Sequence, residues 1–172
     1  DRLFHLNFLG YSVFQTSRRG EYEGNRVASR ARLEGMISRY TGMGLLHEIR
    51  EQLEKVLTSV FHGKYVGCLG VDMMIYEDES GGFGVQPCVE INLRYNMGIV
   101  SIALQRFLQE EVEGVFTIRF SPKPGEIMQS VEENRDAYPL QVKTGRITAG
   151  YINLTPVSRE SRFVAELYVG DK

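Results

Sequence analysis

Four polar side chains near the middle of the chain have types and spacings that could bind a metal ion and a phosphate group. Asp72 lies in one apolar run, and Glu90, Asn92 and Arg94 alternate with apolar residues in a second run. Because successive side chains of a strand point to opposite faces, the last three would share one face, with an apolar face behind them. The spacing predicts strands that are half core and half binding site.

The chemistry that suits this set is coordination of a hard divalent cation. Two neighbouring carboxylates such as Asp72 and Glu90 repel each other unless a positive charge lies between them. Mg²⁺, or Mn²⁺ in its place, takes a few carboxylate oxygens together with water and phosphate oxygens, and the Asn92 carbonyl is a further oxygen ligand. Arg94 could hold a phosphate or a carboxylate with its forked guanidinium group. A solvated sheet face shows the same alternation, so spacing alone leaves that alternative open.

Two predicted strands carry these residues. Residues 65–76 and 85–95 are rich in apolar residues, and the polar, glycine-containing segment 77–82 joins them. This order predicts an antiparallel hairpin, and we expect Asp72 to lie opposite Glu90.

The same register makes further predictions along the hairpin. It places Met74 opposite Cys88 and Tyr76 opposite Gln86. It also keeps Cys68 and Cys88 roughly 20 Å apart, since each strand residue advances about 3.3 Å. A disulfide needs Cα atoms within about 7 Å, so the two thiols are not expected to meet.

The remaining segments predict an α+β fold, in which an antiparallel sheet packs with helices. Apolar residues recur at helical spacing in the segments 27–40, 45–60 and 99–108. Runs typical of strands occupy residues 3–14, 115–120, 151–154 and 163–169. We expect Ile91 and Leu93 to be buried against the helices that contain Leu53 and Phe107.

The segments 70–76 and 87–94 together resemble the signature hairpin of the ATP-grasp superfamily. That signature has a carboxylate on one strand, a turn, and Glu-x-Asn-x-Arg on the next strand, and all four polar positions match here. The resemblance implies that residues 1–114 are the C-terminal subdomain of an ATP-grasp domain and that residues 115–172 are a β-rich tail packed on the same core. We expect the N-terminal lid of that domain to precede this segment in a longer protein.

The resemblance also implies an activity. In that superfamily the carboxylates and the Asn hold Mg²⁺ ions that bridge the ATP phosphates, which implies Asp72, Glu90 and Asn92 as metal ligands. Arg94 would be the catalytic residue that clamps the phosphate or the transition state. The implied reaction activates a small carboxylate substrate as an acyl phosphate, which an amine or another nucleophile then attacks. Phosphoryl transfer depends on positioning and charge neutralisation, so without the lid we expect this fragment alone to be inactive.

A polar loop offers further candidates for nucleotide binding. Arg18, Arg19 and Asn25 lie among glycines there and could contact a phosphate. A solvated turn would have the same composition, and that alternative is left open.

Composition limits the other functional classes. The 172 residues are 42% hydrophobic and 24% charged, which is typical of a globular protein. The net charge of −2 predicts no nucleic-acid partner, and the lack of a long apolar run predicts no membrane span. Two reduced cysteines indicate a cytoplasmic location. A non-catalytic nucleotide- or metal-binding module and a metal-dependent phosphohydrolase are the alternative functions, and the oligomeric state is open.

Overall fold

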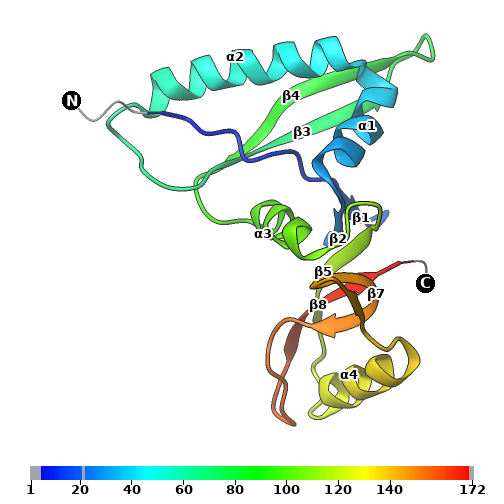
Figure 1. Ribbon diagram of the computed structural model, residues 1–172. Coiled ribbons are helices and arrows are strands. Elements are labelled where there is room, and N and C mark those ends of the chain that lie inside the picture. The colour runs from blue at the N-terminus through cyan, green and yellow to red at the C-terminus, as the bar shows by residue number, and fades with distance from the viewer. Residues whose placement is uncertain (1–4, 21, 171–172) are drawn as a thin grey trace. The chain divides into compact units, whose positions relative to one another are not determined.

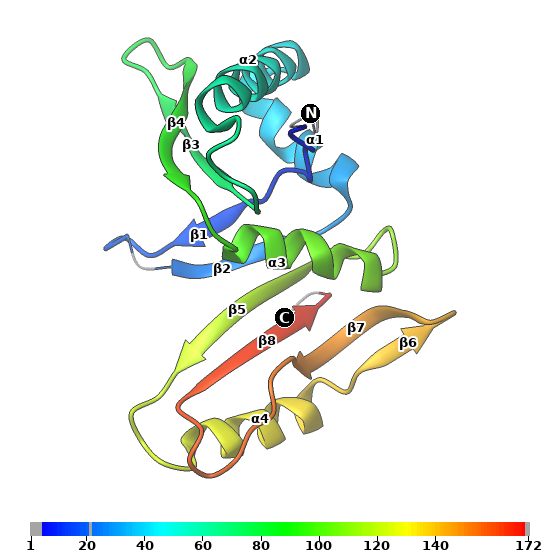
Figure 2. The same cartoon turned by 90° about the vertical axis from the view of Figure 1, so that its left-hand side faces the viewer.

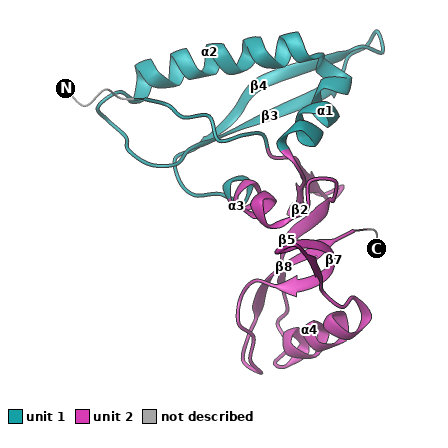
Figure 3. Ribbon diagram, in the orientation of Figure 1, with its two compact units in different colours: residues 1–11, 30–99 teal, residues 12–29, 100–172 magenta. Residues whose placement is uncertain are grey.

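The computed structural model describes residues 5–20 and 22–170. It divides into two compact units, each built from two stretches of the chain (Figure 3). Unit 1 comprises residues 1–11 and 30–99, and unit 2 comprises residues 12–29 and 100–172. The expected boundary at residue 114 falls inside unit 2. The two compact units therefore do not coincide with the two expected segments, residues 1–114 and 115–172. The predicted α+β class is confirmed.

Unit 1 is an antiparallel hairpin accompanied by two helices. Its elements are α1 (Arg30–Thr41), α2 (Met43–Phe61), β3 (Gly70–Glu77) and β4 (Phe83–Asn92). In two views, α2 runs along one side of the hairpin (Figure 1, Figure 2). Gly42 separates the two helices with a φ of 72°, which favours glycine. Leu46 and Leu57 lie on the same stripe of α2 and are buried, as an amphipathic helix requires.

The hairpin confirms the predicted pairing of Asp72 with Glu90, but its register changes beyond that pair. A β-bulge lies between Asp72 and Met74, and Met74 pairs with Gln86 rather than with Cys88. The prediction for Met74 was therefore wrong by two positions. Both cysteines are free.

The bulge also moves the end of the hairpin. Tyr76 pairs with Gly84 rather than with Gln86. The additional residues lie on β4 and include Pro87, which has no N–H group to donate to the ladder. Proline inside a strand pattern is confined to edges and bulges, which gives the physical reason for the shift.

The predicted burial of Ile91 and Leu93 is wrong. Ile91 is 39% exposed and Leu93 is 43% exposed. Leu93 follows the last residue of β4, so its side chain no longer obeys the alternation of the strand. At the other end of β4, Phe83 contacts the ring of Tyr40 from α1, with centroids 5.0 Å apart. The helices therefore cover the apolar face of the hairpin only in part.

Unit 2 is built on a six-stranded antiparallel sheet with the strand order β1-β2-β5-β8-β7-β6. Its strands are β1 (Phe14–Thr16), β2 (Tyr22–Val27), β5 (Gly114–Phe120), β6 (Gln141–Lys143), β7 (Arg146–Asn153) and β8 (Phe163–Val169). The chain passes from unit 1 to unit 2 within α3 (Met97–Leu104), which the short 3₁₀ helix Gln105–Phe107 follows.

One helix covers a face of this sheet. The helix is α4 (Glu126–Ala137), which lies along β7 and β8 (Figure 2). Its residues Ile127 and Val131 form a buried cluster with Tyr151 and Val164. Ile127 and Val131 are four residues apart, so both lie on one stripe of α4, and this stripe forms the buried face of an amphipathic helix.

Several elements of the chain differ from the sequence prediction. Residues 126–137 form α4 and residues 141–143 form β6, neither of which the sequence predicted. Of the strand predicted at residues 3–14, only Phe14 belongs to β1, and residues 3 and 4 lie outside the described residues. Part of the predicted loop forms β2, where Gly24 passes so close to β5 that a Cβ atom would lie 2.8 Å from the Phe116 carbonyl oxygen.

Candidate metal centre on the β3–β4 hairpin

Asp72 and Glu90 are direct cross-strand partners in the β3–β4 ladder. Side chains of such partners stand on the same face, with Cβ atoms about 5 Å apart. Asp72 is half-buried and Glu90 is exposed. The hairpin thus places two carboxylates side by side on one face, with one of them open to solvent.

Asn92 completes this arrangement from the end of β4. It pairs with Gly70, one diagonal step from Asp72, and it is only 8% exposed. Its Nδ2 donates a hydrogen bond to Oδ2 of Asp72 at 3.2 Å. With the amide nitrogen turned toward the carboxylate, the Asn92 carbonyl oxygen is the atom left to accept or coordinate. Asp72, Glu90 and Asn92 are therefore brought together as the sequence predicted.

The three side chains fit the ligand chemistry of Mg²⁺ or Mn²⁺. They offer two carboxylates and one amide oxygen, and such a cation commonly takes its remaining ligands from water and phosphate. Among the described residues, no group of three or more His, Cys, Asp and Glu side chains could hold a metal ion. A cation on this face would thus depend on the Asn92 oxygen and on ligands from outside the protein.

Arg94 lies just beyond the strand. It occupies a bend two residues after Asn92, and its side chain is exposed. Strand alternation therefore does not determine where the Arg94 side chain points. The Glu-x-Asn-x-Arg pattern had predicted that Arg94 shares the face of Glu90 and Asn92. Its place relative to the carboxylates depends on how the segment between β4 and α3 is held.

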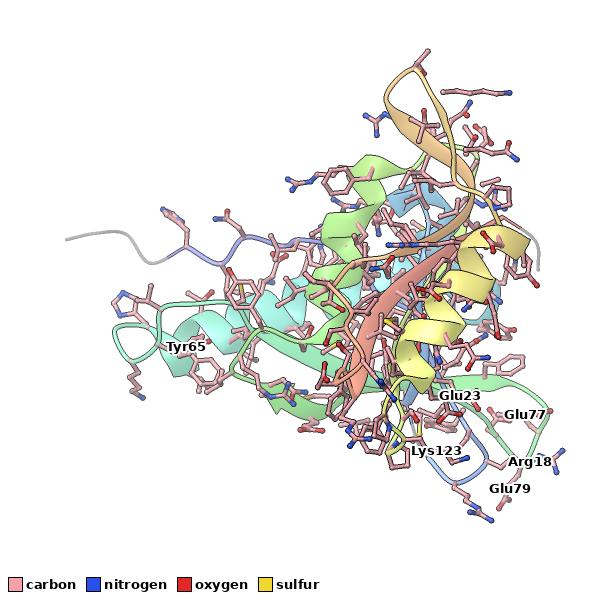
Figure 4. All side chains as sticks on the ribbon, turned by 90° about the horizontal axis from the view of Figure 1, so that it is seen from below. Arg18, Glu23, Tyr65, Glu77, Glu79 and Lys123 are labelled. Atoms are coloured by element: carbon pink, nitrogen blue, oxygen red, sulfur yellow. The ribbon has the colours of Figure 1, made fainter. Side chains whose placement is uncertain are left out.

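The three loop candidates belong to unit 2. Arg18 and Arg19 are exposed in the turn between β1 and β2, and Figure 4 shows Arg18 projecting from that turn. Asn25 is 2% exposed in β2, where its Nδ2 donates to Oγ of Ser12 at 2.7 Å and its Oδ1 accepts a hydrogen bond from the Tyr22 hydroxyl. The Asn25 amide is therefore engaged inside unit 2.

Asn96 and Gly70 lie next to the candidate metal centre, and neither was predicted as a site residue. The side chain of Asn96 accepts a hydrogen bond from the Ile99 N–H at the start of α3, and it also lies over Gly70. The signal in the sequence is an Asn just before an apolar helix, which is the usual pattern of an N-cap. The closeness to Gly70 has no signal in the sequence, because it depends on the loop conformation.

The chain was compared with models of known protein families, with curated proteins and with solved structures, and no match was found in any of the three comparisons. Within the described residues, no helix is both long enough and apolar enough to span a membrane.

Proposed function

We propose that the Asp72–Glu90 face of the hairpin binds a divalent cation together with the phosphates of ATP, in an enzyme of the ATP-grasp type. The observation that carries the proposal is the direct pairing of Asp72 with Glu90 and the hydrogen bond from Asn92 to Asp72. Two adjacent carboxylates repel each other, and the hydrogen bond from Asn92 goes to Asp72, so a cation would relieve the remaining repulsion.

The proposed reaction is ligation of a carboxylate to a nucleophile. The γ-phosphoryl group of ATP passes to a carboxylate oxygen of the substrate, the bond to the β,γ-bridging oxygen breaks, and ADP leaves. An amine then attacks the acyl carbon, inorganic phosphate leaves as the new C–N bond forms, and the nitrogen releases one proton to solvent. Bound Mg²⁺ would supply neutralisation of the phosphate charge during this transfer.

The side chains would divide the work according to their positions. Asp72, half-buried and fixed by Asn92, would be the oriented ligand, and exposed Glu90 would be free to adjust to cation and water. Arg94 would bind a phosphate oxygen with two parallel hydrogen bonds. Each role is one of positioning, which is the main source of catalysis in phosphoryl transfer.

The proposal can be tested by measuring Mg²⁺-dependent ATP binding to the 172-residue chain by NMR titration. We expect Asp72→Asn and Glu90→Gln each to weaken that binding by about tenfold, since each removes one charged ligand. Glu77→Gln and Glu79→Gln are matched controls, because both side chains project from the far end of the same hairpin (Figure 4). Equal losses in the two pairs of variants, or ATP binding that does not require Mg²⁺, would refute the proposal.

A further inference from the structure

The segment that carries Arg94 is tied at several points to the start of β3. Asn92 donates to Asp72, as described above. Asn96 lies against Gly70. Arg94 thus stands between two asparagines that both contact residues of one short stretch of β3.

Asn96 makes two kinds of contact at once. Its Oδ1 accepts the Ile99 N–H at 3.0 Å, which caps the first turn of α3. Its amide also occupies the space that a side chain at position 70 would need. A Cβ atom on Gly70 would overlap Nδ2 of Asn96 and lie 3.3 Å from its Cγ. Glycine at position 70 is therefore what allows the Asn96 amide to lie on the strand.

That contact lies on the same face as the candidate metal centre. Gly70 and Asp72 are two residues apart on β3, so substituents on both point to one face. The Asn96 amide therefore lies on the face of the hairpin that carries Asp72 rather than on the apolar face.

The loop from Asn92 to Asn96 is therefore held at both ends, by the hydrogen bond from Asn92 to Asp72 and by the closeness of the Asn96 amide to Gly70.

We propose that Asn96, lying across Gly70, is the positioning residue that holds the Arg94 backbone beside the Asp72–Glu90 pair. The inference rests on the proposed function, because it concerns the phosphate side of the same site. Arg94 has a long and exposed side chain, so its ordering on a phosphate costs conformational entropy. A fixed backbone removes part of that cost, which is the general benefit of a preorganised site.

The contact with Gly70 can be separated from the helix cap by choice of variant. Serine is as good an N-cap as asparagine, but its shorter side chain does not reach over Gly70. Asn96→Ser should therefore keep the stability of α3 and lose the contact. Asn96→Ala should lose both. Gly70→Ala should displace the Asn96 amide, whereas in the Asn96→Ser background the added methyl group meets no amide.

The experiment compares two ligands on the 172-residue chain by NMR. Mn²⁺ alone reports on the carboxylates, and Mg²⁺ with ATP also reports on Arg94 through its Nε–Hε signal. We expect Asn96→Ser and Gly70→Ala each to weaken binding of Mg²⁺–ATP by about tenfold, which corresponds to one lost phosphate contact, and to leave binding of Mn²⁺ unchanged. The double variant should lose no more than Asn96→Ser does.

The outcomes distinguish the two proposals. One outcome refutes the positioning role alone: Mn²⁺ binds the hairpin, but Asn96→Ser keeps the parental affinity for Mg²⁺–ATP and the parental Arg94 signal. In that case Asn96 is only a helix cap. If the parental chain does not bind Mn²⁺ at Asp72 and Glu90, the proposed function fails, and the positioning role fails with it. Additive losses in the double variant would also contradict a shared contact.

Discussion

The two units place carboxylates in opposite kinds of surroundings. In unit 2, Glu166 of β8 is 2% exposed and accepts hydrogen bonds from Nε and Nη2 of Arg119 at 3.0 and 3.3 Å. The Tyr151 hydroxyl donates a third hydrogen bond at 2.8 Å. In unit 1, Glu90 is exposed and Asp72 receives a side-chain hydrogen bond from Asn92.

This difference shows how the same functional group serves structure in one place and remains available in another. A buried carboxylate with a forked arginine and a tyrosine hydroxyl has its lone pairs occupied, so it stabilises the fold only as part of that network. A pair of carboxylates on an open strand face contributes little to stability, but it retains oxygen atoms for a ligand. The comparison predicts that substitutions in the two units separate loss of stability from loss of binding.

The largest expected effect is on the stability of unit 2. Glu166→Ala leaves the Arg119 charge and the Tyr151 hydroxyl without their acceptor, and breaking one partner of a buried ion pair commonly costs about 3–5 kcal/mol. Because the Arg119 side chain is 32% exposed and can regain water, we expect about 2–3 kcal/mol by urea denaturation. Glu90→Ala should be neutral or slightly stabilising, since it relieves repulsion with Asp72. A greater loss for Glu90→Ala than for Glu166→Ala would make Glu90 the structural residue and reverse the comparison.

A smaller effect concerns alkaline pH. Burial, followed by the hydrogen bond to Glu166, raises the pKa of Tyr151, and burial raises the pKa of Tyr22 to about 12. The folded state therefore keeps these hydroxyls protonated when the unfolded chain, with its ordinary tyrosine pKa near ~10, has lost the proton. The stabilisation is complete below pH ~10 and decreases as the pH rises toward 12.

The test of this pH dependence is Tyr151→Phe. At neutral pH the variant should lose about 1 kcal/mol, the contribution of one hydrogen bond. Between pH ~10 and 12 its stability should decrease less steeply than that of the parental chain, because one of the shifted tyrosines is gone. Equal slopes in the two denaturation series would contradict the assigned role of the Tyr151 hydroxyl.

The central pair of the hairpin was predicted by placing the two carboxylates opposite each other, as the resemblance to the ATP-grasp hairpin implies. The turn alone does not fix that pair, because the pairing of Glu77 with Phe83, continued without a bulge, would place Asp72 opposite Cys88. The sequence did not predict the bulge, which depends on how Pro87 is accommodated within the ladder. It also placed Leu93 in the core by extending the strand one residue too far, although β4 ends at Asn92. The local pattern of a hairpin is thus readable, whereas its end and its irregularities depend on the contacts of neighbouring segments.

Longer-range arrangements were less accessible to prediction. Asn25 has the composition of a loop ligand, but its burial follows from packing of β2 between β1 and β5, which joins residues far apart in sequence. The buried residues of α4 are Ile127 and Val131, and the surface that they contact comes from β7 and β8. Such partners cannot be deduced from local periodicity, since tertiary contacts determine them.

The most direct test of the account is to map where Mn²⁺ lies by paramagnetic broadening of the amide NMR signals. The proposed centre predicts that substoichiometric Mn²⁺ first broadens residues 70–74 and 88–94. Residues 77–82 in the acidic turn, about 20 Å away along the strand, should retain their signals, since each residue advances about 3.3 Å. Mg²⁺ in excess should restore the lost signals by competition. Broadening centred on residues 77–82, or none localised on the hairpin, would contradict a metal centre formed by Asp72, Glu90 and Asn92.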